Sequence, residues 1–422
     1  MNLENALVRY KGYDKTMGLV GRDIKLRDGN FINAIVGPRR AGKTSLMLLY
    51  MQGLEIPESN KVFISCEDID FVGITSGEFD NLEAAIYRVY GPSGKYPIYL
   101  FIDEVQTFPE WPRWLRTLFD QRKYRLFVTG STSELSLDAL PSALRGRAVN
   151  TMVLPFSFKE YLAVRGVGYT KYMGADEKGV LANALTLFIE FGGYPEIARA
   201  GDNELRQAML SELYATVIQR DMIEKYKIRK VTIFKSFINA LFGSACRNLS
   251  PQTLVRWFGS QGVRISTQTA LNYIGYARNA FLFFLVYPYS RKIKERNTKP
   301  KLYVSDSGIL GLFEQDRGKK LENAVLIELK RRNKSVFYYK SAAADVDFVL
   351  TEGNGVGELI QVSYGISDPT TFEREIESLT KAAEDLHCSN LTVVTFDEEK
   401  IIKNGGKNIK VVPAWKWLLE GP

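Results

Sequence analysis

One eight-residue segment constrains the fold of this chain more than any other feature. Residues 37–44 read Gly-Pro-Arg-Arg-Ala-Gly-Lys-Thr, which matches the pattern Gly-x-x-x-x-Gly-Lys-Thr. The apolar run from Ile32 to Val36 predicts a buried strand before this segment, and the apolar residues after Ser45 predict a helix behind it. A strand, a glycine loop and a helix in this order predict a phosphate-binding loop on a parallel α/β sheet.

Each part of this loop has an expected role. The glycines let the backbone direct its N–H groups toward phosphate oxygens, and the helix N-terminus adds positive potential. Lys43 would contact the β- and γ-phosphates, and the Thr44 hydroxyl would face Mg²⁺. We therefore expect ATP and Mg²⁺ as cofactors. The expected nucleotide contacts in the loop are Gly37, Pro38, Arg39, Arg40, Ala41, Gly42, Lys43, Thr44 and Ser45.

A second apolar run ends in two acids. Residues 99–102 are apolar and are followed by Asp103 and Glu104. Ligands bind at the carboxyl ends of strands in such sheets, so we expect both acids near the phosphate loop. Asp103 would hold Mg²⁺, and Glu104 would polarise the water that attacks the γ-phosphate. The alternative is a strand that happens to end in a solvated acidic pair.

Two further segments carry weaker signals. Residues 126–128 predict a third strand, and Thr129 or Ser131 at its tip could hydrogen-bond the attacking water or the γ-phosphate. Arg145 and Arg147 precede another apolar run. Either arginine could stabilise transition-state charge on a γ-phosphate, in its own chain or in a neighbouring chain. The alternative is a pair of solvated surface arginines.

Length and composition set broad limits. A chain of 422 residues is too long for one ordinary core, so we expect two to four domains. The net charge of +8 is compatible with nucleic acid as a partner. The three cysteines form no zinc signature or disulfide framework, which fits a reducing cytoplasm. The longest apolar run, residues 280–287, is too short to span a membrane. A homo-oligomer is compatible with the sequence.

Residues 249–305 differ in pattern from the rest of the chain. Two short amphipathic helices around Gly262 predict a helix-turn-helix. A basic segment follows, and it would form a β-hairpin wing that clamps DNA phosphates. The alternative is a solvated wing on a module that packs against the ATPase part. The basic residues of this segment are Arg291, Lys292, Lys294, Arg296, Lys299 and Lys301, and we expect the first four to contact DNA.

The last third of the chain again alternates strands with helices. Asp347 lies inside an apolar run, as a metal-binding carboxylate on a sheet would. The next expected strand should then supply an acid and a lysine two residues apart. The chain has Gln361 and Ser363 at these positions.

Together these motifs resemble the archaeal and bacterial AAA+-type ATPases that join a phosphate-loop domain to a winged helix and a C-terminal domain like the PD-(D/E)XK nucleases. The shared segments include the phosphate loop, Phe-Ile-Asp-Glu-Val-Gln at 101–106, Leu-Arg-Gly-Arg at 144–147, Gly-Gly-Tyr-Pro-Glu at 192–196 and Val-Asp-Phe at 346–348. The resemblance implies an α/β fold: a P-loop NTPase parallel sheet, a helical lid, a winged helix and a restriction-endonuclease-like α/β domain. The expected boundaries are 1–160, 161–230, 231–310 and 311–422.

The resemblance also implies ATP hydrolysis, with Arg145 or Arg147 as the arginine finger, and nuclease-like acidic positions at Glu322 and Asp347. Gln361-Val362-Ser363 departs from the usual Glu-x-Lys, so we expect a degenerate domain that binds DNA or a partner without cleaving. Lys340 is a weak candidate for the missing lysine. The leading hypothesis is an ATPase that couples nucleotide state to a DNA-binding module. The alternatives are an ATP-gated nuclease and a non-catalytic nucleotide sensor that recruits proteins.

Overall fold

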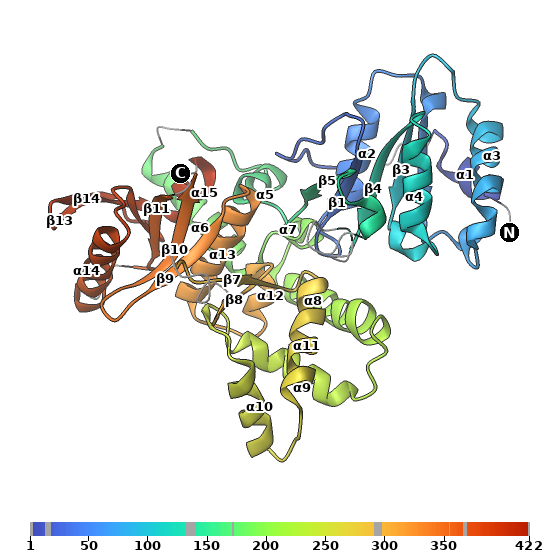
Figure 1. The fold of residues 1–422 in the computed structure, drawn as a ribbon. Helices are drawn as coiled ribbons and strands as arrows, with labels where there is room; N and C mark the ends of the chain where they lie inside the picture. The colour runs from blue at the N-terminus through green and yellow to red at the C-terminus, as the bar shows by residue number, and fades with distance from the viewer. Residues whose placement is uncertain are drawn as a thin grey trace. The chain divides into compact units, whose positions relative to one another are not determined.

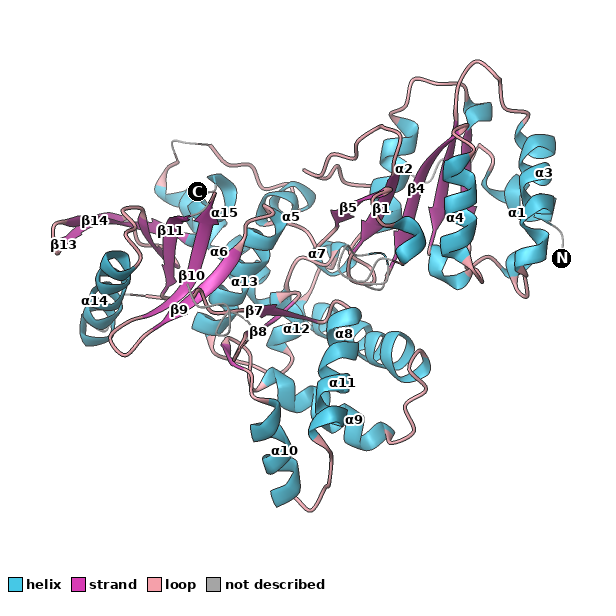
Figure 2. Ribbon diagram, in the orientation of Figure 1, coloured by secondary structure: helices cyan, strands magenta, loops and turns pink. Residues whose placement is uncertain are grey.

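The computed structural model divides the chain into two compact units, Met1–Leu154 and Pro155–Pro422 (Figures 1 and 2). It describes residues 3–12, 18–131, 135, 141–170, 173–290, 298–353, 355–365 and 369–420. The four expected DNA contacts, Arg291, Lys292, Lys294 and Arg296, lie outside the described residues.

The first unit is built on a parallel sheet, which confirms the expected α/β class. In the part of this unit that is described, five strands pair in the order β2-β3-β4-β1-β5. The strands are β1 (Ile32–Val36), β2 (Lys61–Ser65), β3 (Ile98–Asp103), β4 (Tyr124–Gly130) and β5 (Ala148–Met152). The helices are α1 (Leu3–Tyr10), α2 (Lys43–Gln52), α3 (Phe79–Tyr90) and α4 (Trp111–Asp120). Short 3₁₀ turns are η1 (Glu58–Asn60), η2 (Ile69–Phe71), η3 (Ser76–Glu78), η4 (Val105–Thr107) and η6 (Ser142–Leu144).

The strand order decides which loops meet. Strand β4 lies between β1 and β3, with Val36 paired to Gly130 and Ile102 paired to Val128. Because all three strands run in the same direction, their carboxyl ends lie at one edge of the sheet. Helix α4 buries Trp111 and Leu115 with the rest of its apolar stripe, as its i, i+3, i+4, i+7 spacing predicts.

The second unit begins with helices. These are α5 (Phe158–Val164), α6 (Ala175–Phe191), α7 (Pro195–Arg199), α8 (Asn203–Thr216), the π-helical η7 (Val217–Glu224) and α9 (Val231–Phe242). Helix α6 ends at a close backbone crossing. A Cβ atom on Gly192 would lie 1.9 Å from Asp306 Oδ1, and one on Gly193 would lie 2.3 Å from the Phe156 carbonyl oxygen. Only glycine fits at these two positions, which explains the break that the sequence shows here.

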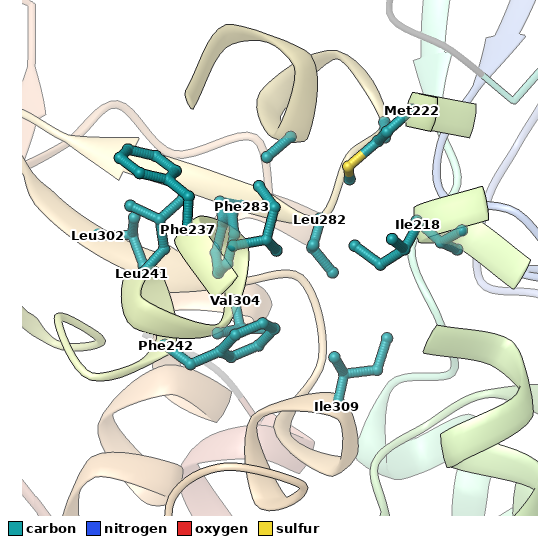
Figure 3. Packing of buried hydrophobic residues seen from close by; sticks show 14 of the residues in the cluster. Ile218, Met222, Phe237, Leu241, Phe242, Leu282, Phe283, Leu302, Val304 and Ile309 are labelled. Carbon is teal, nitrogen blue, oxygen red and sulfur yellow. The ribbon is translucent and has the colours of Figure 1, made fainter. Parts of the chain in front are cut away.

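A small antiparallel sheet and more helices follow. The elements are β6 (Arg247–Asn248), α10 (Pro251–Ser260), α11 (Thr267–Asn279), β7 (Phe283–Val286), β8 (Lys301–Val304) and α12 (Ser307–Gly311). The strands pair in the order β6-β8-β7. Figure 3 shows Met222, Phe237, Leu282 and Ile309 in one core, which extends from Phe191 to Leu310. This core crosses residue 230, the expected end of the helical lid.

One apolar residue of α11 lies outside this core. The Leu271 side chain is 47% exposed. The buried stripe of α11 is instead Ala270, Tyr273, Ile274 and Ala277. This stripe has the i, i+3, i+4, i+7 spacing of one helix face, and Leu271 lies one position off it.

The unit ends with a mixed sheet. Among the described residues, six strands pair in the order β13-β14-β12-β11-β10-β9. They are β9 (Val336–Lys340), β10 (Asp345–Glu352), β11 (Gly355–Val362), β12 (Leu391–Thr395), β13 (Lys400–Asn404) and β14 (Lys407–Pro413). The helices are α13 (Arg317–Arg331), α14 (Pro369–Asp385) and α15 (Ala414–Glu420). The hairpin β13–β14 and helix α15 were not predicted from the sequence.

None of the helices that the structure describes is both long and apolar enough to cross a lipid bilayer.

Candidate functional site

The loop between β1 and α2 has two glycines with positive φ angles. Gly37 has φ 150°, and a Cβ atom there would lie 2.0 Å from the Val153 carbonyl oxygen. Gly42 has φ 96° and is the N-cap residue of α2, which has no side-chain cap hydrogen bond among the described residues. The first amides of α2 can therefore serve an anion. Pro38, Arg39, Arg40 and Ala41 lie in this loop, and Ser45 lies in the first turn of α2.

Lys43 lies inside the loop. Its side chain is only 4% exposed, and its Nζ donates hydrogen bonds to the carbonyl oxygens of Gly37 at 3.1 Å and Pro38 at 3.0 Å. The same nitrogen lies 4.0 Å from Glu104 Oε1. The structure thus brings the predicted lysine and the predicted water-polarising acid together.

Asp103 at the tip of β3 is the centre of a short hydrogen-bond chain. Its Oδ1 accepts from the Thr44 hydroxyl at 2.8 Å and from the Thr129 hydroxyl at 2.6 Å. The Thr129 oxygen in turn accepts from the Glu104 backbone N–H at 2.9 Å. Burial raises the pKa of Asp103 to about 6, although the hydrogen bonds from Thr129 and Thr44 favour the ionised carboxylate.

Glu104 is held in an uncommon backbone conformation. Its φ is 52°, in the left-handed region that costs a non-glycine residue roughly 1–3 kcal/mol. One oxygen, Oε2, accepts from the Ser131 backbone N–H at 3.1 Å and from Nε2 of Gln106. Both hydrogen bonds aim the carboxylate toward the Lys43 ammonium. The strain is therefore stored beside the groups that would carry chemistry.

Gln106 was missed by the sequence reasoning. It lies in η4, and this single turn brings its amide back to Glu104 two residues earlier. Its Nε2 also lies 3.5 Å from Ser131 Oγ, while its Oε1 is buried without a partner among the described residues. The sequence signal for this residue is a glutamine two positions after the Asp-Glu pair, but its contact with Glu104 depends on the turn η4.

Arg22 joins the backbone of the phosphate loop to that of Leu154. Its guanidinium donates to the Ala41 carbonyl oxygen at 2.8 Å and to the Leu154 carbonyl oxygen at 2.7 Å. It therefore braces the backbone of the phosphate loop.

The two candidate finger arginines lie elsewhere in this unit. The Arg147 carbonyl oxygen accepts from the Ile32 N–H at 2.8 Å, at the residue where β1 begins. Its guanidinium lies 3.9 Å from Asp120. Arg145 follows η6 directly and is exposed. Both therefore lie at the amino edge of the sheet, and the structure does not bring them to the phosphate loop at the opposite edge.

The expected acidic positions of the second unit do meet. Asp347 on β10 donates its backbone N–H to Gln361 Oε1 on β11 at 3.3 Å. Glu322 on α13 shares a cation with Asp347, since both lie within 4.0 Å of Lys301 Nζ. Lys301 was expected in the basic surface segment. That expectation is wrong, because the residue is 6% exposed.

The parallel sheet, the glycine loop and the acid-tipped strand define the first unit as a P-loop ATPase domain. Residues 29–162 match the AAA domain family, and residues 183–319 match a domain of unknown function (DUF8612). The chain belongs to the same family as an uncharacterized protein of Methanocaldococcus jannaschii. The two are 32% identical over 96% of this chain and 92% of the relative.

Two other proteins are also similar to this chain. An uncharacterized protein of Haemophilus influenzae is 26% identical over 94% of this chain and 96% of its own length. Among solved structures, a Walker-type ATPase of Pyrococcus abyssi aligns with a TM-score of 0.42 and 13% identity. That alignment covers 67% of this chain and 90% of the other.

Proposed function

We propose that the first unit hydrolyses ATP to ADP and phosphate in a Mg²⁺-dependent reaction. The observation that carries this proposal is the position of Glu104. Its carboxylate lies 4.0 Å from the Lys43 ammonium, next to the Asp103–Thr44 pair, and a backbone amide and a side-chain amide fix it there. A solvated acidic pair, the alternative considered above, would not need these contacts.

The residues present fit a magnesium–triphosphate. The loop is too tight for a Cβ at Gly37, the start of α2 offers its amides, and Asp103 supplies a buried carboxylate beside the Thr44 hydroxyl. Bound Mg²⁺ would neutralise charge on the phosphate oxygens.

The remaining chemistry belongs to the chain. Lys43 would bind the phosphates by its charge, and Thr44 and Asp103 would hold the cation and its water ligands. Glu104 would orient a water and accept its proton, while Thr129 fixes the Glu104 backbone through the N–H bond of 2.9 Å.

Two substitutions test this proposal. Lys43→Ala should abolish ATP binding, because it removes the positive charge inside the loop. Glu104→Gln should keep ATP bound and lower turnover by about 10²–10⁴-fold, since an amide cannot accept the proton. Glu110→Gln is the control, because Glu110 is an exposed acid that pairs with Arg113 at 3.1 Å. Calorimetry with ATP and a phosphate-release assay give the two readouts. Wild-type turnover in Glu104→Gln would refute the assigned role.

The arginine finger is proposed to act between two copies of the chain. The five residues of β1 separate the Arg147 backbone from the phosphate loop by about 16 Å, at roughly 3.3 Å per residue. A neighbouring copy could present its amino edge to this site. Mixing inactive Arg147→Ala protein with inactive Lys43→Ala protein should then restore part of the activity. A mixture with no gain in activity would remove the finger role between copies.

We further propose that the second unit binds DNA. Helices α10 and α11 with the antiparallel β7 and β8 have the element order of a winged helix-turn-helix, and this order supports the proposal. Affinity for duplex DNA should fall steeply with salt. The double variant Arg291→Ala/Lys292→Ala should reduce the slope of log affinity against log salt concentration by about 2. An unchanged slope would exclude both residues from the interface.

The last sheet is proposed to be a nuclease-like fold without cleavage activity. Glu322 and Asp347 both lie near Lys301 Nζ, which supports the fold, while Gln361 and Ser363 replace the usual acid and lysine, which supports the loss of activity. A plasmid-nicking assay with Mn²⁺ distinguishes this proposal from an ATP-gated nuclease.

A further inference from the structure

A lysine side chain lies inside the acidic site of the second unit. Lys301 on β8 is 6% exposed. Its Nζ donates a hydrogen bond to Asp347 Oδ1 at 3.0 Å and lies 3.9 Å from Glu322 Oε1 and 4.0 Å from Asp345 Oδ1. The ring of Tyr338 lies 5.5 Å from the same nitrogen. A lysine this deeply buried needs such counter-charges.

Two carboxylate oxygens of the acids around Lys301 also accept hydrogen bonds from other donors. Asp347 Oδ2 accepts from the Val362 backbone N–H at 3.1 Å, and Glu322 Oε1 accepts from the Tyr303 hydroxyl at 2.7 Å. Gln361 Oε1 faces the Asp347 N–H at 3.3 Å. Over the described residues, no group of three or more His, Cys, Asp or Glu side chains is arranged to hold a metal ion. The residues present therefore do not fit the divalent cation that a nuclease-like fold implies.

The charge balance supports the same assignment. Burial alone would lower the pKa of Lys301, but the carboxylates of Asp347 and Glu322 raise it above its usual value, so the ammonium stays charged. Burial raises the pKa of Glu322, and the Asp347 charge adds to this shift. Adding a divalent ion beside a fixed ammonium would place like charges a few ångströms apart.

We propose that Lys301 is the resident cation of this acidic site, where its ammonium takes the place that a divalent metal ion has in a metal-dependent sheet of this kind. The lysine also joins β8 of the small sheet to β10 of the large sheet. The site is a structural ion cluster and not a catalytic metal centre. The inference is independent of ATP hydrolysis.

The test uses Mn²⁺ as the probe, with the full-length protein and no nucleotide. Asp347→Asn should leave the Mn²⁺ isotherm of the wild-type protein unchanged, because Lys301 already neutralises that carboxylate. A Mn²⁺ site in the wild type that Asp347→Asn removes would overturn the proposal, as would Mn²⁺-dependent nicking of plasmid that Asp347→Asn abolishes. Neither result would bear on the phosphate loop, which is tested separately by Lys43→Ala and ATP.

Thermal unfolding provides a second, independent readout. Lys301→Met should lower the melting temperature by about 5–10 °C, since it leaves two buried carboxylates without their cation. Adding Asp347→Asn to Lys301→Met should recover part of this loss. The matched control is Lys320→Met. Lys320 is also buried, at 1% exposure, but pairs with Glu190 at 2.9 Å, so Asp347→Asn should not rescue it. The proposal would be contradicted if Asp347→Asn restored the melting temperature equally in both lysine variants.

Discussion

Uncharged hydrogen-bond donors fix the direction of the two carboxylates in the phosphate site. Glu104 is aimed by Gln106 and by the Ser131 amide, and Asp103 is held by the hydroxyls of Thr44 and Thr129. A carboxylate that accepts a proton from one particular water must be held in a fixed direction. Gln106 is therefore a positioning residue in this site.

Gln106→Ala should lower kcat for ATP by about tenfold and leave KM within about twofold, because orientation matters in the transition state and not in ground-state binding. Steady-state kinetics measure both values. Gln121→Ala is the control, since Gln121 donates to Glu83 at 3.4 Å on the exposed surface. In the Glu104→Gln background, Gln106→Ala should cause no further loss. An additive loss would mean that Gln106 acts independently of Glu104.

We expect Asp103 to make the stability of the ligand-free protein depend on pH. Its pKa of about 6 exceeds the usual value of 3.8, so the folded state retains a proton that the unfolded state releases. This stabilisation is complete below about pH 4 and is lost as the pH rises through 6. Asp103→Asn should remove the effect. The free energy of unfolding of Asp103→Asn should exceed that of the wild type by a difference that grows between pH 4 and 7, to an amount on the order of 3 kcal/mol. Urea unfolding without nucleotide measures this difference, and a gain that does not change with pH would contradict the assignment.

At the scale of elements, the crossing of α6 and α12 depends on one buried carboxylate. Asp306 caps α12 and accepts from the backbone N–H groups of Gly193 and Gly308, both at 2.8 Å. Asp306→Ala should lower the free energy of unfolding by roughly 2–4 kcal/mol, because these buried amides would lose their acceptor. Asp202→Ala, at the exposed cap of α8, should cost only about 1 kcal/mol. Denaturant unfolding compares the two, and equal costs would show that burial of the cap is unimportant.

The sequence predicted most elements whose signal is local. The phosphate loop, the acid at the tip of β3 and the stripe on α4 follow from short patterns that need no knowledge of distant residues. Gln106 was missed because its role depends on the turn η4. Lys301 was assigned to a basic surface, since 46 residues separate it from Asp347 and the two residues lie on strands of different sheets, so only the tertiary fold of the second unit brings them together. A side-chain contact across such a distance leaves no local pattern in the chain.

At the scale of the whole molecule, each unit has its own hydrophobic core. One core in the first unit includes Ile35, Met47 and Phe127, and the second unit contains the cluster in Figure 3. We therefore expect two calorimetric transitions for the full chain. ATP with Mg²⁺, added to Glu104→Gln protein at about 100 times Kd, should raise the midpoint temperature of only one transition. The unit that binds ATP should gain about 2.7 kcal/mol of unfolding free energy. Lys43→Ala should abolish the rise. A single transition that shifts as a whole would show that the cores unfold together.

The ion cluster around Lys301 limits where this chain can be shortened. A fragment that ends at residue 310, as the domain pattern suggests, would retain the ammonium but discard both Glu322 and Asp347. Lys301 on β8 would then keep its positive charge without these two carboxylates, which is a reason for such a fragment to aggregate. A division between Leu154 and Pro155, at the boundary of the two compact units, preserves this electrostatic balance, so it is the better starting point for separate expression of either unit.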